Sequence, residues 1–346
     1  MIPYTLKRTL YLLLAFFFVL WLILLIIRAG PSYFHNAIGE DLFGFTLPSA
    51  EAYFTKFHHG DWTFGEQYGS LLFGDAAVGQ NGTFQGLWRG DLGEPFRLFG
   101  SHKNPPDVTA LLRQTLPVSL RLALPALVVS LLLGVALSAV TASLRMRWLV
   151  RINRWLFLGL FSLSFVVLNP WILWLVRYRL GWLPWYGNVC FELPCPAGWL
   201  PLISLIIPLT SGIAYWMIGH FQDIQAQPAV ILAQSQGLKR QTVLFQTILP
   251  RLVLVLLDKL PFILMILIVG TVVAESFYYL PGMGRLYLEA VYFQEHPILI
   301  GLTIVWCGAG LVARYLADLL IAWLDPRQQQ ASATIFYPQV NRYELS

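Results

Sequence analysis

The chain alternates long apolar stretches with shorter polar ones. A transmembrane helix needs about 20 consecutive apolar residues. Six windows meet that length, roughly 9–28, 116–141, 155–176, 200–219, 252–274 and 299–323. We therefore predict an all-α polytopic membrane protein with six transmembrane helices.

The first window resembles a secretory signal peptide, because Lys7 and Arg8 precede its apolar run. The run Leu10–Ile27 is longer than the apolar region of a signal peptide, and no small-residue cleavage site follows it. We therefore expect the first helix to be retained as a span.

Basic residues indicate the orientation, since cytoplasmic loops carry an excess of Lys and Arg. The N-terminal tail, the loop after the second window and the loop after the fourth window are basic: Lys7, Arg8, Arg145, Arg147, Arg151, Arg154, Lys239, Arg240 and Arg251. The segment 29–110 is rich in acids instead. This pattern places both termini in the cytoplasm. Arg177 and Arg179 oppose it, but their side chains can snorkel beside Trp182.

Composition agrees with a membrane protein. Hydrophobic residues make up 57% of the 346 positions and charged residues only 12%, whereas a soluble domain carries about 25% charged residues. The net charge of +5 comes from scattered residues or residues beside apolar windows. No basic groove or stacking module is visible, which argues against nucleic-acid binding.

The outer segment 29–110 is too long for a plain loop and is rich in Gly and aromatic residues. We expect 33–106 to form an ordered cap over the mouth of the protein. Cys190 and Cys195 lie close together in a predicted outer loop, where a disulfide can form in an oxidising compartment. The alternative is two unpaired thiols, and Cys307 is expected to be a packing residue.

A compact helix is predicted at about 228–248, between the fourth and fifth windows. Ala233 and Gly237 leave a low-profile notch on one face, where another protein surface can approach closely. Leu249-Pro250 is expected to stop this helix and return the chain to the membrane. We expect a cytoplasmic partner to be engaged by Ala233, Gln234, Gly237, Leu238, Leu249 and Pro250.

Ionisable residues within the apolar windows are costly unless they have partners. They are Asp258, Lys259, Glu275, Arg314 and Asp318, of which the last two are spaced i, i+4 and can pair along one helix face. They are either structural ion pairs or residues that line a substrate path. No acid–base or nucleophile–base set accompanies them, so we expect no enzymatic site.

Other candidate motifs are weak. Gly74 to Gly79 imitates a phosphate loop but lacks the Lys and the Ser or Thr that such a loop requires. His58-His59 is a single adjacent pair, which cannot place both rings on one metal ion from a helix. We therefore expect no metal site and no ATP hydrolysis in this chain.

Several short motifs occur in a characteristic order between about residue 90 and residue 327. They are Gly90-Asp91-Leu92-Gly93, Trp182-Leu183-Pro184, Ala233 to Gly237 with Leu249-Pro250, Pro281-Gly282-Met283-Gly284-Arg285 after Glu275, and Asp325-Pro326-Arg327. In this order, across six predicted spans, the chain resembles the inner-membrane permease subunits of peptide-type ABC importers, the oligopeptide/dipeptide permease family.

The resemblance implies a type I importer architecture, with an N-terminal tail and first helix at 1–28, the extracytoplasmic segment 29–110, a permease core at 111–327 and a cytoplasmic tail at 328–346. It also implies a second related permease, two cytoplasmic ATPases that bind ATP and Mg, and an external substrate-binding protein. The helix at 228–248 would be the coupling helix. This chain itself would hold no cofactor.

The chain departs from the family pattern in three places. The usual Gly-Asp-Pro after the first span is only Ala29-Gly30-Pro31-Ser32. Residues 228–236 lack the usual acid-aromatic pair and basic residues, and 33–89 has no counterpart. The substrate therefore stays open among peptides, nickel chelates, glutathione, short sugars and cationic antimicrobial peptides. A secondary transporter and a structural membrane subunit are the alternatives from other classes, and the ATPase activity of the complex distinguishes them.

Overall fold

The computed structural model describes residues 2–29, 64–73, 86–90, 92, 107–144, 146–181, 199–293 and 295–324. Within these ranges every regular element is a helix. The described chain forms two compact units. One contains Met1–Leu12, Ser119–Leu280 and Gly308–Ser346, and the other contains Leu13–Val118 and Pro281–Cys307. Two long helices, α5 (Val108–Ala142) and α13 (His296–Leu324), contribute to both.

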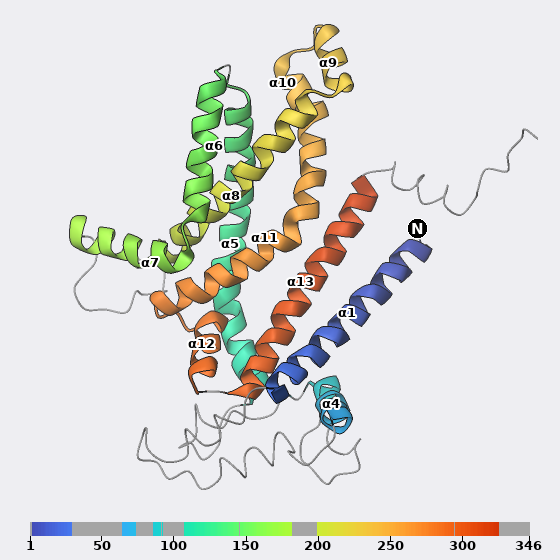
Figure 1. The fold of residues 1–346 in the computed structure, drawn as a ribbon, viewed down its shortest axis with the longest axis vertical. Coiled ribbons are helices and arrows are strands. Elements are labelled where there is room, and N and C mark those ends of the chain that lie inside the picture. The colour runs from blue at the N-terminus through green and yellow to red at the C-terminus, as the bar shows by residue number, and fades with distance from the viewer. Residues whose placement is uncertain are drawn as a thin grey trace, which may run out of the picture. The chain divides into compact units, whose positions relative to one another are not determined.

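The first unit is built around α8 (Leu200–Gln225), which packs against α6 (Arg147–Ser162) and α11 (Leu249–Phe277). Figure 1 shows α8 crossing between these two helices. Most of α8 is buried, because apolar residues occupy nearly its whole circumference. The remaining helices of this unit are α7 (Phe165–Trp174), π-helix η3 (Leu175–Arg179), α9 (Pro228–Ser235), α10 (Arg240–Val243) and π-helix η4 (Leu244–Ile248).

Close helix contact in this unit depends on Gly134 of α5. A Cβ atom at this position would lie 2.7 Å from the Cβ of Ile213 and 3.3 Å from the carbonyl oxygen of Thr210. Only glycine lets the two backbones approach this closely. Gly134 therefore fixes the distance between α5 and α8.

The second unit contains α1 (Ile2–Ala29) from Leu13 onward, α4 (Phe64–Phe73), the 3₁₀ helix η2 (Leu87–Arg89) and α12 (Met283–Phe293). Its core joins residues from α5, α12 and α13: Val108, Leu111, Leu112, Met283, Leu286, Ala290, Ile298 and Leu302. The hydroxyl of Tyr68 in α4 donates to the carbonyl of Phe17 in α1 across 3.0 Å. Most of the predicted cap, 33–106, lies outside the described residues.

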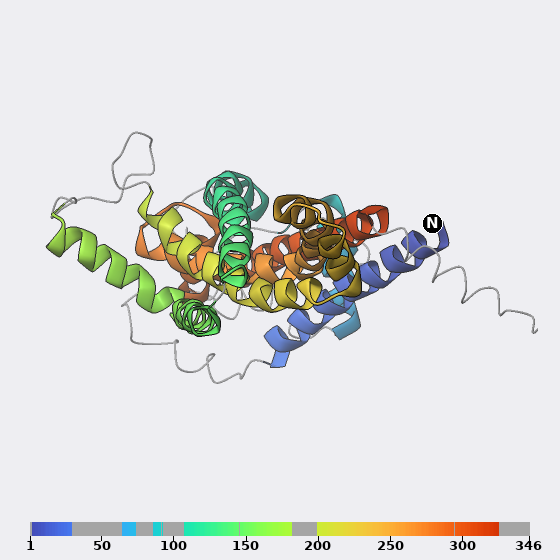
Figure 2. The ribbon, with the colours of Figure 1, turned by 90° about the horizontal axis from the view of Figure 1, so that it is seen from above.

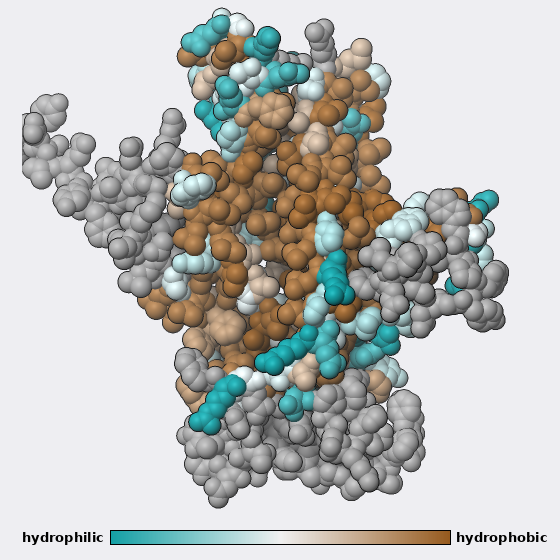
Figure 3. Space-filling model, turned by 180° about the vertical axis from the view of Figure 1, so that it is seen from behind, coloured by the Kyte–Doolittle hydropathy of each residue, from teal (hydrophilic) through white to brown (hydrophobic). Residues whose placement is uncertain are grey.

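Four of the predicted spans are confirmed as continuous helices that are long and apolar enough to cross a membrane. Among the described residues these are Val108–Ala142, Leu200–Gln225, Gln241–Phe277 and Pro297–Leu324. The helix α1 contains the apolar stretch Thr9–Leu22. On the face drawn in Figure 3, hydrophobic residues cover most of the described helical surface, as a lipid-facing protein requires.

The predicted span at 155–176 is bent. Its residues fall in α6 and α7, which meet at an angle of 91° and form either a broken span or a re-entrant segment. Leu163 is extended between them, and the side chain of Ser164 caps α7 by accepting a hydrogen bond from the backbone N–H of Val166. Hydropathy alone does not register such a cap, so the bend escaped the sequence prediction.

Candidate functional site

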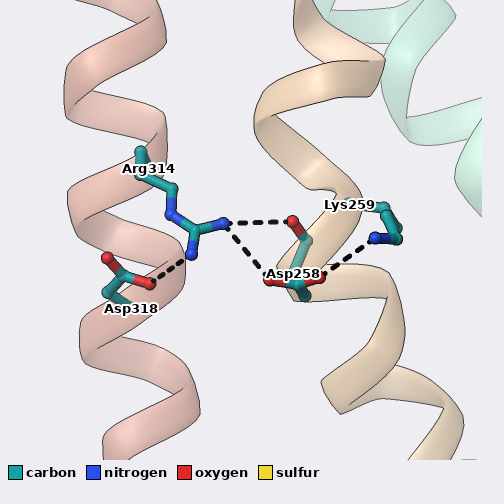
Figure 4. Close-up of polar contacts among 4 residues, drawn as sticks. All are labelled: Asp258, Lys259, Arg314 and Asp318. Carbon is teal, nitrogen blue, oxygen red and sulfur yellow. Dashed lines mark hydrogen bonds and ion pairs between the residues drawn. The ribbon is translucent and has the colours of Figure 1, made fainter.

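The charged residues predicted within the spans gather into one cluster. Arg314 of α13 donates from Nη1 to Oδ1 of Asp258 on α11 across 3.2 Å and to the Asp258 carbonyl across 3.4 Å (Figure 4). Its Nη2 lies 3.4 Å from Oδ1 of Asp318, one helical turn along α13. Lys259 Nζ lies 3.2 Å from the other Asp258 carboxylate oxygen. The predicted i, i+4 pair of Arg314 and Asp318 is present, while the link to Asp258 required the fold.

The cluster is only partly buried. The exposed side-chain fractions are 46% for Asp258, 48% for Lys259 and 40% for Arg314, against 9% for Asp318. Charged groups in a spanning segment are costly when they face lipid.

The cluster forms one wall of a cavity of about 690 Å³ in the first unit. This volume is in the range of small-molecule binding pockets, about 300–1,000 Å³. Asp258, Lys259 and Arg314 line one side. Arg154 of α6 and a row of α8 residues line the rest, and the α8 row is Tyr215, Trp216, Gly219, His220 and Asp223.

The cavity wall combines charge with aromatic surface. The guanidinium of Arg154 lies over the Tyr215 ring, 5.2 Å from its centroid, a cation–π arrangement that holds the arginine in place. The rings of Trp216 and Phe262 lie 5.3 Å apart on the same cavity. Sequence reasoning used Arg154 only for orientation and missed the α8 residues. Their spacing, with Tyr215, Gly219 and Asp223 at i, i+4 and i+8, was the signal that could have found them.

The predicted helix at 228–248 is not one helix. It consists of α9, a break at 236–239, α10 and η4. Gly237 has a φ of 76° in the left-handed region that favours glycine, so it ends the first piece rather than forming part of a helical notch. Figure 2 shows α9 and α10 next to each other, in agreement with their contacts.

One further prediction about this segment, the role of Pro250, is corrected. Ala233 is partly buried against the core of the first unit, and its role in a partner contact stays a prediction. Pro250 lies in the first turn of α11, where proline is tolerated, and the span runs without interruption from Gln241 to Phe277. Proline therefore does not stop the helix here. Gln234 and Leu238 are exposed, as a partner contact requires.

The segment α9 is attached firmly to the first unit. Val230 is fully buried in its core. The side chain of Arg251, at the start of α11, donates to the side-chain oxygen of Gln227, directly before α9. Contacts of α9 and of the residue directly before it therefore reach both α8 and α11.

Other motif residues shape backbone turns or the second unit. Gly90 has a φ of 77° and caps η2, and Leu92 packs against the core of the second unit. Pro281 and Gly282 precede α12, Gly284 is buried in its first turn, and Arg285 donates to Glu289 across 2.7 Å. Glu275 is fully buried near the end of α11. Outside the described residues lie Asp91, Gly93, Trp182, Pro184, Cys190, Cys195, Asp325, Pro326 and Arg327.

Comparison with known proteins places this geometry in context. The family model described as the binding-protein-dependent transport system inner membrane component matches residues 115–330. A protein of Brucella suis biovar 1 whose name includes "peptide transport system permease protein" is 30% identical over 257 residues, which cover 70% of this chain and 76% of that protein. The oligopeptide transport system permease protein OppB of Haemophilus influenzae is 27% identical over 247 residues, which cover 70% of this chain and 77% of that protein. The corresponding protein AppB of Bacillus subtilis is 24% identical over 233 residues, covering 64% and 72%.

Proposed function

This chain belongs to the family of binding-protein-dependent transport system inner membrane components, and we propose that it forms half of the translocation path of an ATP-driven importer for peptides. As a member of this family it is a multi-pass permease subunit of the inner membrane, and ATP hydrolysis belongs to separate subunits. Peptides are the proposed substrate because relatives along most of the chain are named for peptide and oligopeptide transport.

The complete assembly in this proposal contains this chain, a second related permease, two ATPases that bind ATP and Mg, and an external substrate-binding protein. Six transmembrane helices with both termini in the cytoplasm are part of the proposal, with α1 and the bent α6–α7 pair as two of the six. Fluorescent-protein fusions at the two termini test the orientation, because such a fusion fluoresces when it remains in the cytoplasm.

The segment α9 and the loop after it are the proposed docking surface for an ATPase. Apolar side chains there are exposed, namely Ile231, Leu232 and Leu238, with Phe245 close behind in η4. Such a patch in the cytoplasm is unfavourable in water, and a partner groove that covers it is stabilised by the burial. Because Val230 and Gln227 anchor α9 to the first unit, movement of the ATPase is transmitted to α8 and α11.

The charged cavity is the proposed part of the translocation path. Asp258, Lys259 and Arg314 are about half exposed within apolar helices. This exposure supports the proposal that their side chains border water rather than lipid, where charges are costly. Alternating access requires a path that is polar, opens on one side at a time and lies between helices that move. The cavity is lined by α8 and α11, the two helices to which α9 is attached.

The observation that carries the proposal is the apolar face of α9 held on α8 and α11, and one variant tests it. Ile231→Asp combined with Leu232→Asp places two charges on the docking surface without touching the buried Val230. We expect the purified complex to lose stimulation of its ATPase activity by the binding protein. The matched control is Ile231→Val with Leu232→Met, which changes the same two positions but keeps both side chains apolar. Full stimulation in the α9 variant contradicts the proposed docking.

A further inference from the structure

Two charged residues of the cavity make no ion pair with any residue that the structure describes. Lys259 and Arg314 each form an ion pair with Asp258. By contrast, Arg154 and Asp223 line the same cavity, and neither makes an ion pair within the described part of the chain. Arg154 lies against the face of the Tyr215 ring. Counting the described residues alone, the cavity therefore offers a ligand one cation and one carboxylate that are outside any ion pair.

These two charges lie at opposite ends of the cavity floor. Tyr215, Gly219 and Asp223 occupy one face of α8 at i, i+4 and i+8. Eight residues of α-helix rise about 12 Å. Because the Arg154 guanidinium sits over Tyr215, the cation and the Asp223 carboxylate are separated along α8 by a distance of that order.

The floor between the two charges is open. A Cβ atom added at Gly219 would meet nothing within 4 Å, so space lies directly above the helix backbone at this position. Trp216 and Phe262 supply apolar surface beside it, and His220 adds a hydrogen-bonding group. A ligand that lies along this floor can thus have charged ends and side chains of varied polarity in its middle.

We propose that this cavity binds a short zwitterionic peptide, with its terminal carboxylate on Arg154 and its terminal ammonium on Asp223. An extended chain advances about 3.3–3.6 Å per residue, so a tripeptide places its two terminal charges about 10 Å apart. The planar guanidinium of Arg154 can donate two parallel hydrogen bonds to a carboxylate. An anion without an ammonium group is repelled by Asp223, and a cation without a carboxylate is repelled by Arg154.

This inference rests on the proposed function and makes it more specific, since it gives the path a site that recognises both ends of its cargo. Both charged ends lie on α6 and α8, beside the α11–α13 ion pairs. Such a site differs from a purely steric channel, because the membrane subunit itself would bind the charged termini of the peptide.

The test uses the complete complex in proteoliposomes with the same binding protein throughout. Initial ATP-driven uptake is measured for trialanine with free ends, with an amidated C-terminus and with an acetylated N-terminus. Two ratios of initial uptake rate describe each variant. The free-to-amidated ratio compares the unmodified peptide with the amidated one, and the free-to-acetylated ratio compares it with the acetylated one. Any preference of the binding protein is common to all variants, so a change in a ratio reports on this chain.

For Arg154→Gln we expect the free-to-amidated ratio to fall about fivefold while the free-to-acetylated ratio is unchanged, as the loss of one partly exposed charge contact implies. For Asp223→Asn we expect the reverse pattern, and Arg154→Lys keeps both ratios near those of the parent. Arg151→Gln is the matched control, because Arg151 lies one turn earlier on α6 and outside the cavity. Ratios are unaffected by a lower amount of folded complex.

Three results overturn the inference. Unchanged ratios in both cavity variants exclude terminal recognition here while the proposed function stands. If both uptake-rate ratios fall in each variant, the variants have a general defect, and the two residues do not each bind one peptide terminus. If the parent complex shows no ATP-driven uptake of any of the three peptides, the proposed function fails, and the inference fails with it.

Discussion

The guanidinium of Arg314 and the carboxylate of Asp258 lie 3.2 Å apart and join α13 to α11 across 56 positions of sequence. Each residue also has a neighbour of opposite charge on its own helix, Asp318 for Arg314 and Lys259 for Asp258. The four charges thus form a chain along the cavity wall, in which each inner charge has two partners. Such an arrangement holds two helices together and can release them without leaving a charge unpaired.

We predict that Asp258→Asn slows peptide uptake severalfold, because Arg314 then loses its charged partner on α11. The pair is nearly half exposed, so the loss in free energy of unfolding is small, about 0.5 kcal/mol. Lys259→Gln is the matched control, since it removes the neighbouring charge but leaves the contact between the helices.

A double-mutant cycle of Asp258→Asn and Arg314→Gln separates the effect of losing their contact from the other effects of each single change on the uptake rate. We expect the double variant to be no slower than Asp258→Asn alone, because both changes remove the same interaction. Additive losses in uptake rate would show that the two residues act independently, which contradicts the link between α11 and α13.

Gly237 is expected to act through its backbone. Its φ of 76° is costly for a residue with a Cβ atom, about 1–2 kcal/mol, and nothing crowds the space around it. Gly237→Phe and Gly237→Val should therefore uncouple ATP hydrolysis from uptake while the subunit remains in the membrane. Gly237→Asn should be tolerated, because asparagine adopts the left-handed region more readily.

Variants of Gly237 also distinguish two explanations of why glycine is needed there: close approach of a partner protein, or the left-handed backbone conformation. If a small residue is needed for close approach of a partner, Ala is accepted and Asn is not. The backbone explanation predicts that Asn is accepted at least as well as Ala. Coupling is measured as peptide imported for each ATP hydrolysed.

The packing of α5 on α8 gives a prediction about stability. Gly134→Val should lower the thermal stability of the detergent-solubilised subunit, with a cost of about 1–3 kcal/mol, because the added side chain meets Ile213 and the backbone at Thr210. Gly159→Val on α6 is the control, since nothing lies within 4 Å of the position its Cβ would take. Equal melting temperatures for the two variants would be inconsistent with this contact.

The extracytoplasmic segment stays a prediction. Deletion of roughly 45–85 removes α4, whose Tyr68 donates to α1. We expect uptake to be abolished or its selectivity to broaden, while the protein still inserts into the membrane. A tyrosine-to-phenylalanine change at Tyr68 serves as the mild companion variant, because it removes one hydrogen bond and keeps the ring. Unchanged uptake rate and substrate preference after the deletion would mean that the segment is dispensable.

The predicted disulfide has its own measurement. Non-reducing mass spectrometry of the mature protein should find the peptides of Cys190 and Cys195 linked. Free thiols at both positions after rapid alkylation would refute it.

Much of the fold could be predicted from the sequence, because the length and apolarity of a run determine whether it can span a bilayer. The helices α5, α8, α11 and α13 follow from this argument alone. The bend between α6 and α7 could not be predicted in the same way. It depends on the extended Leu163 and the Ser164 cap, a local choice that does not change average hydropathy.

Part of the candidate site could also be predicted from the sequence. Charges inside apolar windows are conspicuous, so Asp258 and Arg314 were found, and Asp318 was assigned to Arg314 by helical spacing. Arg154 and Asp223 lie near the ends of their helices, where charged residues are common and attract no attention. Their importance arises only when α6 and α8 bring them to one cavity. Sequence spacing also did not show that Ala233 packs against the core of the first unit, because spacing alone does not report what a helix face contacts.

The central claim is that this chain forms part of an ATP-driven peptide importer, and the direct measurement is uptake by the complete complex in proteoliposomes. Labelled tripeptide and binding protein are supplied outside, and ATP with Mg is supplied at the ATPase side. We predict uptake against a concentration gradient that requires ATP and the binding protein and is lost when Ile231 and Leu232 are both replaced by Asp. Uptake that proceeds without ATP and follows an imposed proton or sodium gradient would contradict this account and favour a secondary transporter.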